Sequence, residues 1–370
     1  KSGVMFSKSF WLLVGWLMLG LPANSRATSF ERRLFDFTPV SSTNPVVARI
    51  GNTMEIPMSE YRAYVAAEKE AIIRTNASFA EKQAVLDDLI GEYLLVDDAY
   101  KNGVDKHPEF LRKMDYTRTI LLSEFLTAQE VDAKAKTADE YHRLLADLQN
   151  RVFEAAEIIV SNEAYEKLKK AAREINAADQ TSIDRKASMA RIRAVMESMD
   201  ESVLARYDNE KVTVKEVLAI YANLHAPRPR LETKQDLIDI LKPLVMPSLL
   251  AAEARKRGIE NHADFKNKIE QNRNALLRIY EHGRLQQQAS DGMKAPDLSE
   301  RLRAWYEQNK EHYAIDGAAG SKTIPPYSEV RERVEGDYSV GLWERAEADK
   351  IRSLRKSCQV KIDDAVLRQY

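Results

Sequence analysis

Cysteine, glycine and proline are scarce in this sequence. The chain has 370 residues but a single cysteine, Cys358, which excludes any disulfide within the chain. Its 13 glycines and 12 prolines leave long stretches without a residue that interrupts a helix. Hydrophobic residues make up 44% of the sequence, so a chain of this length can bury a sizeable core and has room for two domains. The composition favours a soluble, mainly helical protein.

An excess of charge of one sign is also absent. The 56 basic residues nearly balance the 57 acidic ones, so no overall field attracts nucleic acid or an anionic membrane surface. Sequence signatures of catalytic and metal sites are missing as well: there is no Cys-x2-Cys, His-x3-His, calcium loop, phosphate loop or Gly-x-Ser-x-Gly elbow. The sequence therefore predicts no cofactor, no metal site and no nucleic-acid partner.

Long hydrophobic runs are missing except near the N-terminus. After the basic Lys8 comes an apolar run, Phe10–Leu21, which is shorter than the roughly 20 residues of a membrane span. The small residues Ser25 and Ala27 follow at the spacing of a cleavage site. This pattern predicts a secretory signal peptide over residues 1–27 and an exported protein, periplasmic or extracellular. An uncleaved N-terminal anchor, which would be the protein's link to a membrane, is the alternative.

The most informative feature of the sequence is a repeated segment. Gly103-Val-Asp-Lys-His-Pro-Glu-Phe110 returns 155 positions later as Gly258-Ile-Glu-Asn-His-Ala-Asp-Phe265. Each copy follows one long helical pattern and precedes another, so its glycine is typical of the residue just past the end of a helix. The segment predicts the corner of an αα-hairpin, present twice. We interpret His107 and His262 as equivalent capping or packing residues, not as metal ligands.

The repeat extends to both sides of this corner. Upstream, Val47–Asn52 matches Leu204–Asn209, and downstream the offset of 155 positions places Phe125 on Tyr280. We therefore predict a mainly α fold of two duplicated helical units with a few short strands and a long C-terminal helix. The predicted order is a signal peptide (1–27), a first unit (28–160), the remnant of an inserted module with a linking helix (161–200), a second unit (201–315), and a linker with the closing helix and terminal strand (316–370).

Two segments have the character of strands. Phe153–Val160 is predicted to be a strand at the end of the first unit. In Cys358–Ile362, apolar residues alternate with polar ones, which is typical of a strand. This strand needs a partner, because a lone strand leaves its backbone groups unpaired. Its candidate partners are Val46–Ile50 and Val203–Tyr207.

Helix starts and breaks can also be located. Capping boxes are predicted at Ser78–Glu81, Thr137–Glu140 and Thr213–Glu216, where a hydroxyl residue precedes a glutamate by three positions. Pro243 and Pro247 are expected to kink or break the helix before the second corner. In this stretch the alignment gives the second copy three extra residues.

The order of these elements resembles the SurA-like chaperone domain of the exported parvulin-type peptidyl-prolyl isomerases. The resemblance rests on the opening strand and turn, the helix pair around Gly103, the helix start at Thr137, and the closing helix and strand from Ile324 to Ile362. It covers most of the mature chain. It implies a helical chaperone domain that surrounds an isomerase module.

The isomerase module departs from the family pattern. Where its first strand carries the active-site histidine, this chain has Ala155-Ala-Glu-Ile-Ile-Val160, with Glu157 in the histidine position. The later glycine segments and the closing Gly-x-His strand are missing. In the second copy the short segment Asp316–Thr323 stands where a whole module would be inserted. The resemblance thus implies a degenerate isomerase site in one copy and a lost site in the other, and no catalytic residue is predicted.

Six aromatic and methionine side chains have two interpretations. They can pack in the core, or, if the helices splay apart, some of them can line an apolar groove that accepts varied peptides. These peptide-groove candidates are Tyr61, Tyr64, Tyr93, Phe110, Met114 and Phe125.

The sequence therefore predicts an exported, non-catalytic chaperone-like protein. Its partners would be unfolded or extended protein segments, bound at two duplicated sites. One alternative is a structural accessory subunit of an envelope or secreted complex, with a single fixed partner. The other is an active peptidyl-prolyl isomerase.

Overall fold

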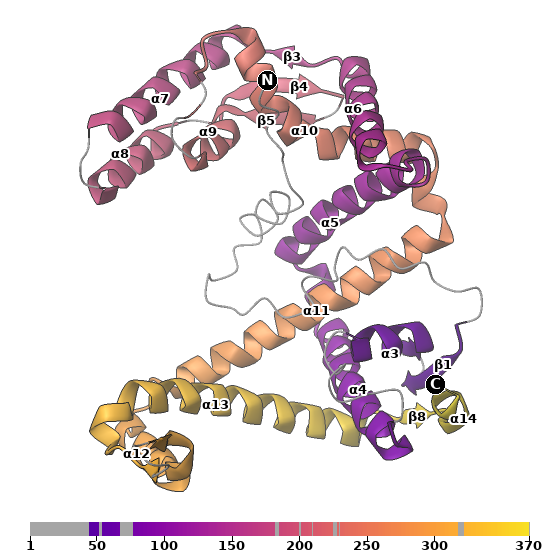
Figure 1. Cartoon of the computed structure of the whole chain (residues 1–370), viewed down its shortest axis with the longest axis vertical. Coiled ribbons are helices and arrows are strands. Elements are labelled where there is room, and N and C mark those ends of the chain that lie inside the picture. The colour runs from indigo at the N-terminus through magenta and orange to yellow at the C-terminus, as the bar shows by residue number, and fades with distance from the viewer. Residues whose placement is uncertain are drawn as a thin grey trace. The chain divides into compact units, whose positions relative to one another are not determined.

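The chain divides into two compact units, each of which is mainly helical. The computed structural model describes residues 44–369 except 52–53, 67–76, 182–184, 200, 209, 225–227, 229 and 317–321. Unit 1 comprises the described residues up to Asp115 and from Asn267 onward, and unit 2 comprises Tyr116–Lys266. The prediction of a mainly α fold with a few short strands is confirmed (Figure 1). The predicted signal peptide lies outside the described residues.

Unit 1 combines elements from both ends of the chain. A three-stranded sheet with the order β2-β1-β8 packs with α3, α4 and α14, and α4 also packs against α13. The elements are β1 (Val46–Ile50), β2 (Met54–Pro57), α3 (Met58–Tyr64), α4 (Phe79–Lys101), η2 (Val104–Lys106), α12 (Leu298–Gln308), η5 (Lys310–Tyr313), β6 (Ile315–Asp316), β7 (Lys322–Thr323), α13 (Tyr327–Ser357), β8 (Val360–Ile362) and α14 (Asp364–Arg368).

Unit 2 is built from the middle of the chain. Its three-stranded sheet has the order β3-β4-β5, and α10 packs against both α6 and α9. The elements are η3 (Ala128–Asp132), α6 (Ala138–Ala155), β3 (Ile159–Val160), α7 (Asn162–Thr181), α8 (Arg185–Glu197), β4 (Val203–Tyr207), β5 (Glu210–Thr213), α9 (Val214–Asn223), α10 (Lys234–Lys256) and η4 (Ile259–Asn261). Two further helices, α5 (Pro108–Thr127) and α11 (Ala263–Gly292), each begin in one unit and end in the other.

The two sheets begin with equivalent hairpins. β1 pairs antiparallel with β2, and β4 pairs antiparallel with β5. The register shifts at the same place in both, between Val46 and Ala48 in the first hairpin and between Val203 and Ala205 in the second. The two first strands also share one order of buried and exposed residues. This agreement in backbone detail supports the duplication read from the sequence.

The third strand of each sheet comes from the other copy of the repeat. β8 follows the helices of the second copy but pairs with β1, whereas β3 follows those of the first copy and pairs with β4. The registers are equivalent: Ile362 lies opposite Ala48, and Val160 lies opposite Ala205. The prediction that the terminal run pairs with Val46–Ile50 or its repeat is confirmed.

Backbone hydrogen bonds continue this equivalence beyond the strands. The N–H of Asp363 donates to the carbonyl of Val47 over 2.9 Å, and the N–H of Ser161 donates to the carbonyl of Leu204 over 2.8 Å. A buried side chain then follows four positions later in each case, Leu367 and Tyr165 respectively. Each sheet therefore closes in the same way, with a hairpin from one copy and a strand from the other.

The predicted strand at Phe153–Val160 is mostly wrong. Phe153 lies in the last turn of α6, and only Ile159–Val160 form a strand. Phe153 is partly buried and packs against the core of unit 2, and its carbonyl accepts a hydrogen bond from the N–H of Ala156. The helix therefore satisfies both the side chain and the backbone up to this point.

The long helices before the corners, α4 and α10, are equivalent over their whole length. Each has 23 residues, and their capping residues Ser78 and Thr233 stand 155 positions apart, as the corners do. The prediction of three extra residues in the second helix is therefore wrong, because α4 and α10 have the same length. Pro243 and Pro247 do not break α10, which runs continuously through them, because a capping box at Thr233 and buried apolar residues on both sides of the prolines hold it.

The other two predicted capping boxes differ from one another. Thr213 and Glu216 form a complete box, as do Ser78 and Glu81. Thr137 accepts a hydrogen bond from the N–H of Glu140, but the Glu140 carboxylate accepts from the N–H of Lys136. That helix start is therefore capped, although the box is shifted by one residue.

The two corners have the same backbone geometry, as the repeat predicts. Gly103 and Gly258 both adopt the left-handed conformation, with φ of 70° and 73°. Each glycine is followed by a short 3-10 helix and then by an extended histidine, His107 or His262. The left-handed conformation explains the repeated glycine, since other residues adopt it only at a cost.

Replacing Gly103 by alanine tests this reading of the corner. A Cβ atom would meet nothing within 4 Å at Gly103 or at the helical Gly283 of the same unit, so the two substitutions differ only in backbone conformation. Gly103→Ala is expected to lower the free energy of unfolding by about 1–2 kcal/mol. Gly283→Ala is expected to raise it by about 0.5–1 kcal/mol. Chemical denaturation of both variants measures the difference, and equal effects would contradict the strained corner.

Cutting the chain once between the two copies tests the strand exchange. With a protease site inserted after Met199, between α8 and β4, both units contain residues from both sides of the cut. The cleaved protein is expected to elute as one particle in size-exclusion chromatography and to give two bands only after denaturation. Two fragments that separate in native buffer would show that each copy folds independently.

Candidate functional site

Most of the peptide-groove candidates lie in the cores of the two units. Tyr61, Tyr93, Phe110, Met114 and Phe125 are buried, and Tyr64 is half-buried against the core of unit 1. The hydroxyl of Tyr61 donates to the carbonyl of Lys82 over 3.1 Å. In the structure described here, these side chains follow the core interpretation, and the groove interpretation would require the helices to separate.

Two of these aromatic residues form equivalent ring contacts. Phe110 meets Tyr280 within unit 1 at 5.8 Å between ring centroids, and Phe265 meets Phe125 within unit 2 at 5.4 Å. Phe110 corresponds to Phe265 in the repeat, and Phe125 corresponds to Tyr280. Each corner phenylalanine therefore packs on an aromatic residue from the other copy.

The remaining predicted positions are on the surface. His107 and His262 are exposed, and the side-chain amide of Gln129 lies 3.5 Å from Nδ1 of His262. Glu157 is exposed in the short connection between α6 and β3. No pair of these residues is brought together by the fold.

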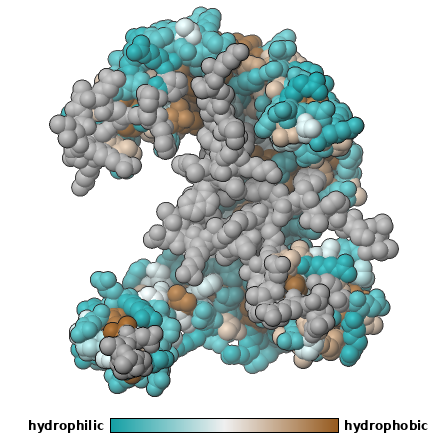
Figure 2. All heavy atoms as spheres, in the orientation of Figure 1, coloured by the Kyte–Doolittle hydropathy of each residue, from teal (hydrophilic) through white to brown (hydrophobic). Residues whose placement is uncertain are grey.

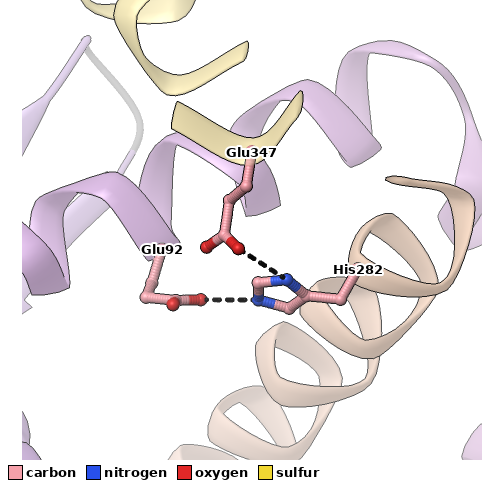
Figure 3. Close-up of side chains that lie close together, drawn as sticks. All are labelled: Glu92, His282 and Glu347. Atoms are coloured by element: carbon pink, nitrogen blue, oxygen red, sulfur yellow. Dashed lines mark hydrogen bonds and ion pairs between the residues drawn. The ribbon is translucent and has the colours of Figure 1, made fainter. Parts of the chain in front are cut away.

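The structure does bring together three residues that sequence reasoning missed. Glu92 on α4, His282 on α11 and Glu347 on α13 converge within unit 1 (Figure 3). Nε2 of His282 lies 3.1 Å from a carboxylate oxygen of Glu92, and Nδ1 lies 3.8 Å from a carboxylate oxygen of Glu347. The imidazole ring thus lies between two carboxylates that are about one fifth exposed.

The two carboxylates have opposite electrostatic situations. Burial opposes the ionisation of Glu92, but the hydrogen bond with His282 and the charge of Arg278, 3.9 Å away, hold its pKa below the usual value. Burial is the largest effect at Glu347, and it raises the pKa of the carboxyl group. The negative charges of Glu92 and Glu344 raise this pKa further, and the nearby His282 lowers it by less than burial raises it. The fold therefore favours the charged form of Glu92 and disfavours that of Glu347.

His282 responds to the same neighbours. Burial favours its neutral form, but the hydrogen bond and the charge of Glu92, together with the charge of Glu347, raise its pKa above the usual value. Nδ1 of His282 is buried and has no hydrogen-bond partner among the described residues. The Trp343 ring packs edge-on against the imidazole, with 6.1 Å between the ring centroids.

Unit 2 shows that the fold does not need this cluster. Through the 155-residue offset, Glu92 corresponds to Pro247 and His282 to Thr127. α13 and α6 end at equivalent positions before β8 and β3, which places Glu347 on Leu145. The equivalent positions of unit 2 therefore carry proline, threonine and leucine. The charged cluster is therefore a property of unit 1 alone.

A second feature, shared by both units, is an open sheet edge. β8 and β3 are the outer strands of their sheets, and no other described strand pairs with their outer sides. Ile362 on β8 is 38% exposed, and Ile159 on β3 is 68% exposed. Because hydrogen bonds to the neighbouring strand alternate along an antiparallel pair, the backbone groups of Ile362 and Val160 point outward.

Comparison with known proteins adds no relative: no protein-family model, no curated protein and no solved structure matches this chain. In the part of the chain that the structure covers, no helix is both long enough and apolar enough to span a membrane.

The cluster predicts that two similar substitutions have different effects on stability. Because the pKa of Glu92 is lowered on folding, its carboxylate stabilises the fold above the unfolded-state pKa, and this contribution is lost as the pH falls. Because the pKa of Glu347 is raised, its carboxylate costs stability at neutral and higher pH. At pH 8, Glu92→Gln is expected to lower the free energy of unfolding by about 1–3 kcal/mol. Glu347→Gln is expected to leave it unchanged or raise it.

Urea denaturation of the two variants at pH 8 measures this contrast. Arg278 and His282 lose a partner in the first variant, whereas an unfavourable charge disappears in the second. Equal destabilisation by both substitutions would mean that Glu347 is as well compensated as Glu92, contrary to the charge distribution described here.

Proposed function

We propose that this protein is an exported, chaperone-like protein that holds extended segments of other polypeptides along the outer edges of β3 and β8. The observation that carries the proposal is the pair of equivalent open edges, one in each unit, with an exposed isoleucine on each strand. The order of elements that resembles the SurA-like domain supports the same class of function.

Binding at such an edge uses the backbone of the client. An unpaired strand edge offers a row of N–H and C=O groups to which an extended segment can add as a further strand. Main-chain hydrogen bonds depend little on the sequence of the client, so one edge can accept many segments. In its own sheet, each of Ile159 and Ile362 offers an apolar contact to client side chains that lie on the same face as the isoleucine.

The face of the molecule drawn in Figure 2 favours a narrow binding mode over a broad groove. On the face drawn in Figure 2, hydrophilic residues cover most of the described surface, and hydrophobic residues occur in small patches. The groove candidates are mostly buried. A strand edge needs only a few exposed apolar side chains, because most of the affinity comes from backbone hydrogen bonds.

Duplication gives the proposed function a further advantage. A short strand binds weakly, since few hydrogen bonds oppose the entropy lost by the client. Two edges in one chain allow two segments of the same client to bind, and the second binding event is then intramolecular. Two weak sites can in this way hold an unfolded chain without a catalytic residue.

Proline substitutions at the outward-facing positions test the proposal. Proline at Val160 or Ile362 removes an N–H that points away from the neighbouring strand, so the sheet keeps its own hydrogen bonds. Val160→Pro and Ile362→Pro are each expected to weaken the suppression of client aggregation, measured by light scattering. The double variant is expected to lose most of it. Val340→Ser, which removes a half-exposed apolar side chain from α13, is the matched control and is expected to protect like the unmodified protein.

The outcomes separate the possible functions. A correctly folded double variant that still protects clients would overturn binding at the edges. Pull-down of one stoichiometric partner, with no protection of unfolded clients, would instead support the accessory-subunit alternative. Acceleration of proline-limited refolding that disappears on Glu157→Ala would support the isomerase alternative.

A further inference from the structure

The cluster of Glu92, His282 and Glu347 has the donor atoms and the spacing of a metal site. One ligand atom from each residue lies within 4.8 Å of the others (Figure 3). The three side chains come from three different helices of the same unit. Imidazole nitrogen and carboxylate oxygen together suit Zn²⁺ and chemically similar divalent ions such as Co²⁺.

The imidazole ring is oriented by one carboxylate so that its other nitrogen is free. Nε2 of His282 lies at hydrogen-bond distance, 3.1 Å, from Glu92, and Arg278 lies near the same carboxylate. Histidines that bind metal almost always donate their second ring N–H to such a carboxylate or carbonyl group. With Nε2 as the donor, the lone pair of Nδ1 becomes available to an ion.

The space between Nδ1 and Glu347 fits an ion better than a hydrogen bond. The separation of 3.8 Å between Nδ1 and the carboxylate oxygen is too long for a hydrogen bond. Two atoms that each bind one tetrahedral zinc ion at about 2.0–2.2 Å lie about 3.3–3.6 Å apart, which is only slightly less than the separation seen here. Nδ1 is also buried without a hydrogen-bond partner in the described structure, and an unsatisfied buried polar atom is costly.

The comparison between the two units adds an independent argument. The same junction of helices in unit 2 carries Pro247, Thr127 and Leu145, so folding does not require charge at these positions. Unit 1 nevertheless holds two carboxylates on either side of one imidazole. A cation bound between them would offset the repulsion between the two negative charges.

We propose that His282 and Glu347 bind a divalent metal ion of the Zn²⁺ class, with Glu92 as the positioning residue that orients the imidazole. Nδ1 of His282 and a carboxylate oxygen of Glu347 are the protein ligands, and water completes the coordination. The ion links α11 to α13 within unit 1, while the hydrogen bond from Nε2 links α11 to α4. This inference is independent of the proposed binding of polypeptides, because none of the three residues lies on β3 or β8.

Metal titration of the full chain tests the site. After treatment with EDTA and its removal, the protein is titrated with zinc chloride in a calorimeter and with cobalt chloride in an absorption spectrometer. One ion is expected to bind per chain, and zinc is expected to raise the melting temperature. His282→Gln and Glu347→Gln are expected to abolish both effects. Glu92→Gln is expected to weaken binding by about 10–100-fold.

Two control variants distinguish this site from adventitious binding by histidine. His107 and His262 are exposed and lie at the corners, so His107→Gln and His262→Gln are expected to leave the titration unchanged. Glu347→Gln also keeps the test valid if His282→Gln fails to fold. Absence of stoichiometric zinc binding, or equal binding by Glu347→Gln and the unmodified protein, would overturn the proposal and leave the cluster as an ion pair only.

Discussion

The pairing of each closing strand with the hairpin of the other copy is the interaction on which the rest of the structure depends. A strand as short as β3 or β8 cannot satisfy its own backbone groups, so it must add to an existing sheet. Here the sheets that receive them belong to the opposite copies, at equivalent registers. The helices that precede the strands, α6 and α13, accordingly pack on α10 and α4. Each compact unit is therefore a composite of both copies, and neither sheet is complete without both parts of the chain.

The same reciprocity appears in the side chains that pack around the corners. The left-handed glycine ends one helix and directs the next, and the phenylalanine seven positions later packs on an aromatic residue of the other copy. The contact between Phe110 and Tyr280 is thus repeated by their equivalents, Phe265 and Phe125. Such paired, equivalent contacts are typical of the interface in a symmetric dimer. In this protein they occur within a single chain, because the two copies are covalently joined. The same set of contacts thus occurs twice in one chain, once in each unit.

Departures from this internal symmetry show where the two units differ in their chemistry. At the junction of α4, α11 and α13, unit 1 has charged residues where unit 2 has Pro247, Thr127 and Leu145. Burying charge costs free energy unless each group has a partner, and Glu347 is only partly compensated, as its raised pKa indicates. The open edges of β3 and β8, in contrast, are common to both units. A function that uses both units is therefore best assigned to the edges, and a property of unit 1 alone to the cluster.

The sequence by itself determined the local features, since these depend on residues close together in the chain. Gly103 and Gly258 specify left-handed corners because of their missing Cβ atoms, and the capping residues Ser78 and Thr213 locate two helix starts from patterns four residues long. The alternation in Cys358–Ile362 indicated a strand that needs a partner, and β1 was one of the two candidate partners. Only the tertiary structure decided which copy supplies each third strand, because both hairpins present the same pattern. It alone revealed the cluster of Glu92, His282 and Glu347, whose members lie far apart in the chain and carry no spacing signal. Their proximity depends on how three helices pack in space, and local sequence patterns do not encode that arrangement.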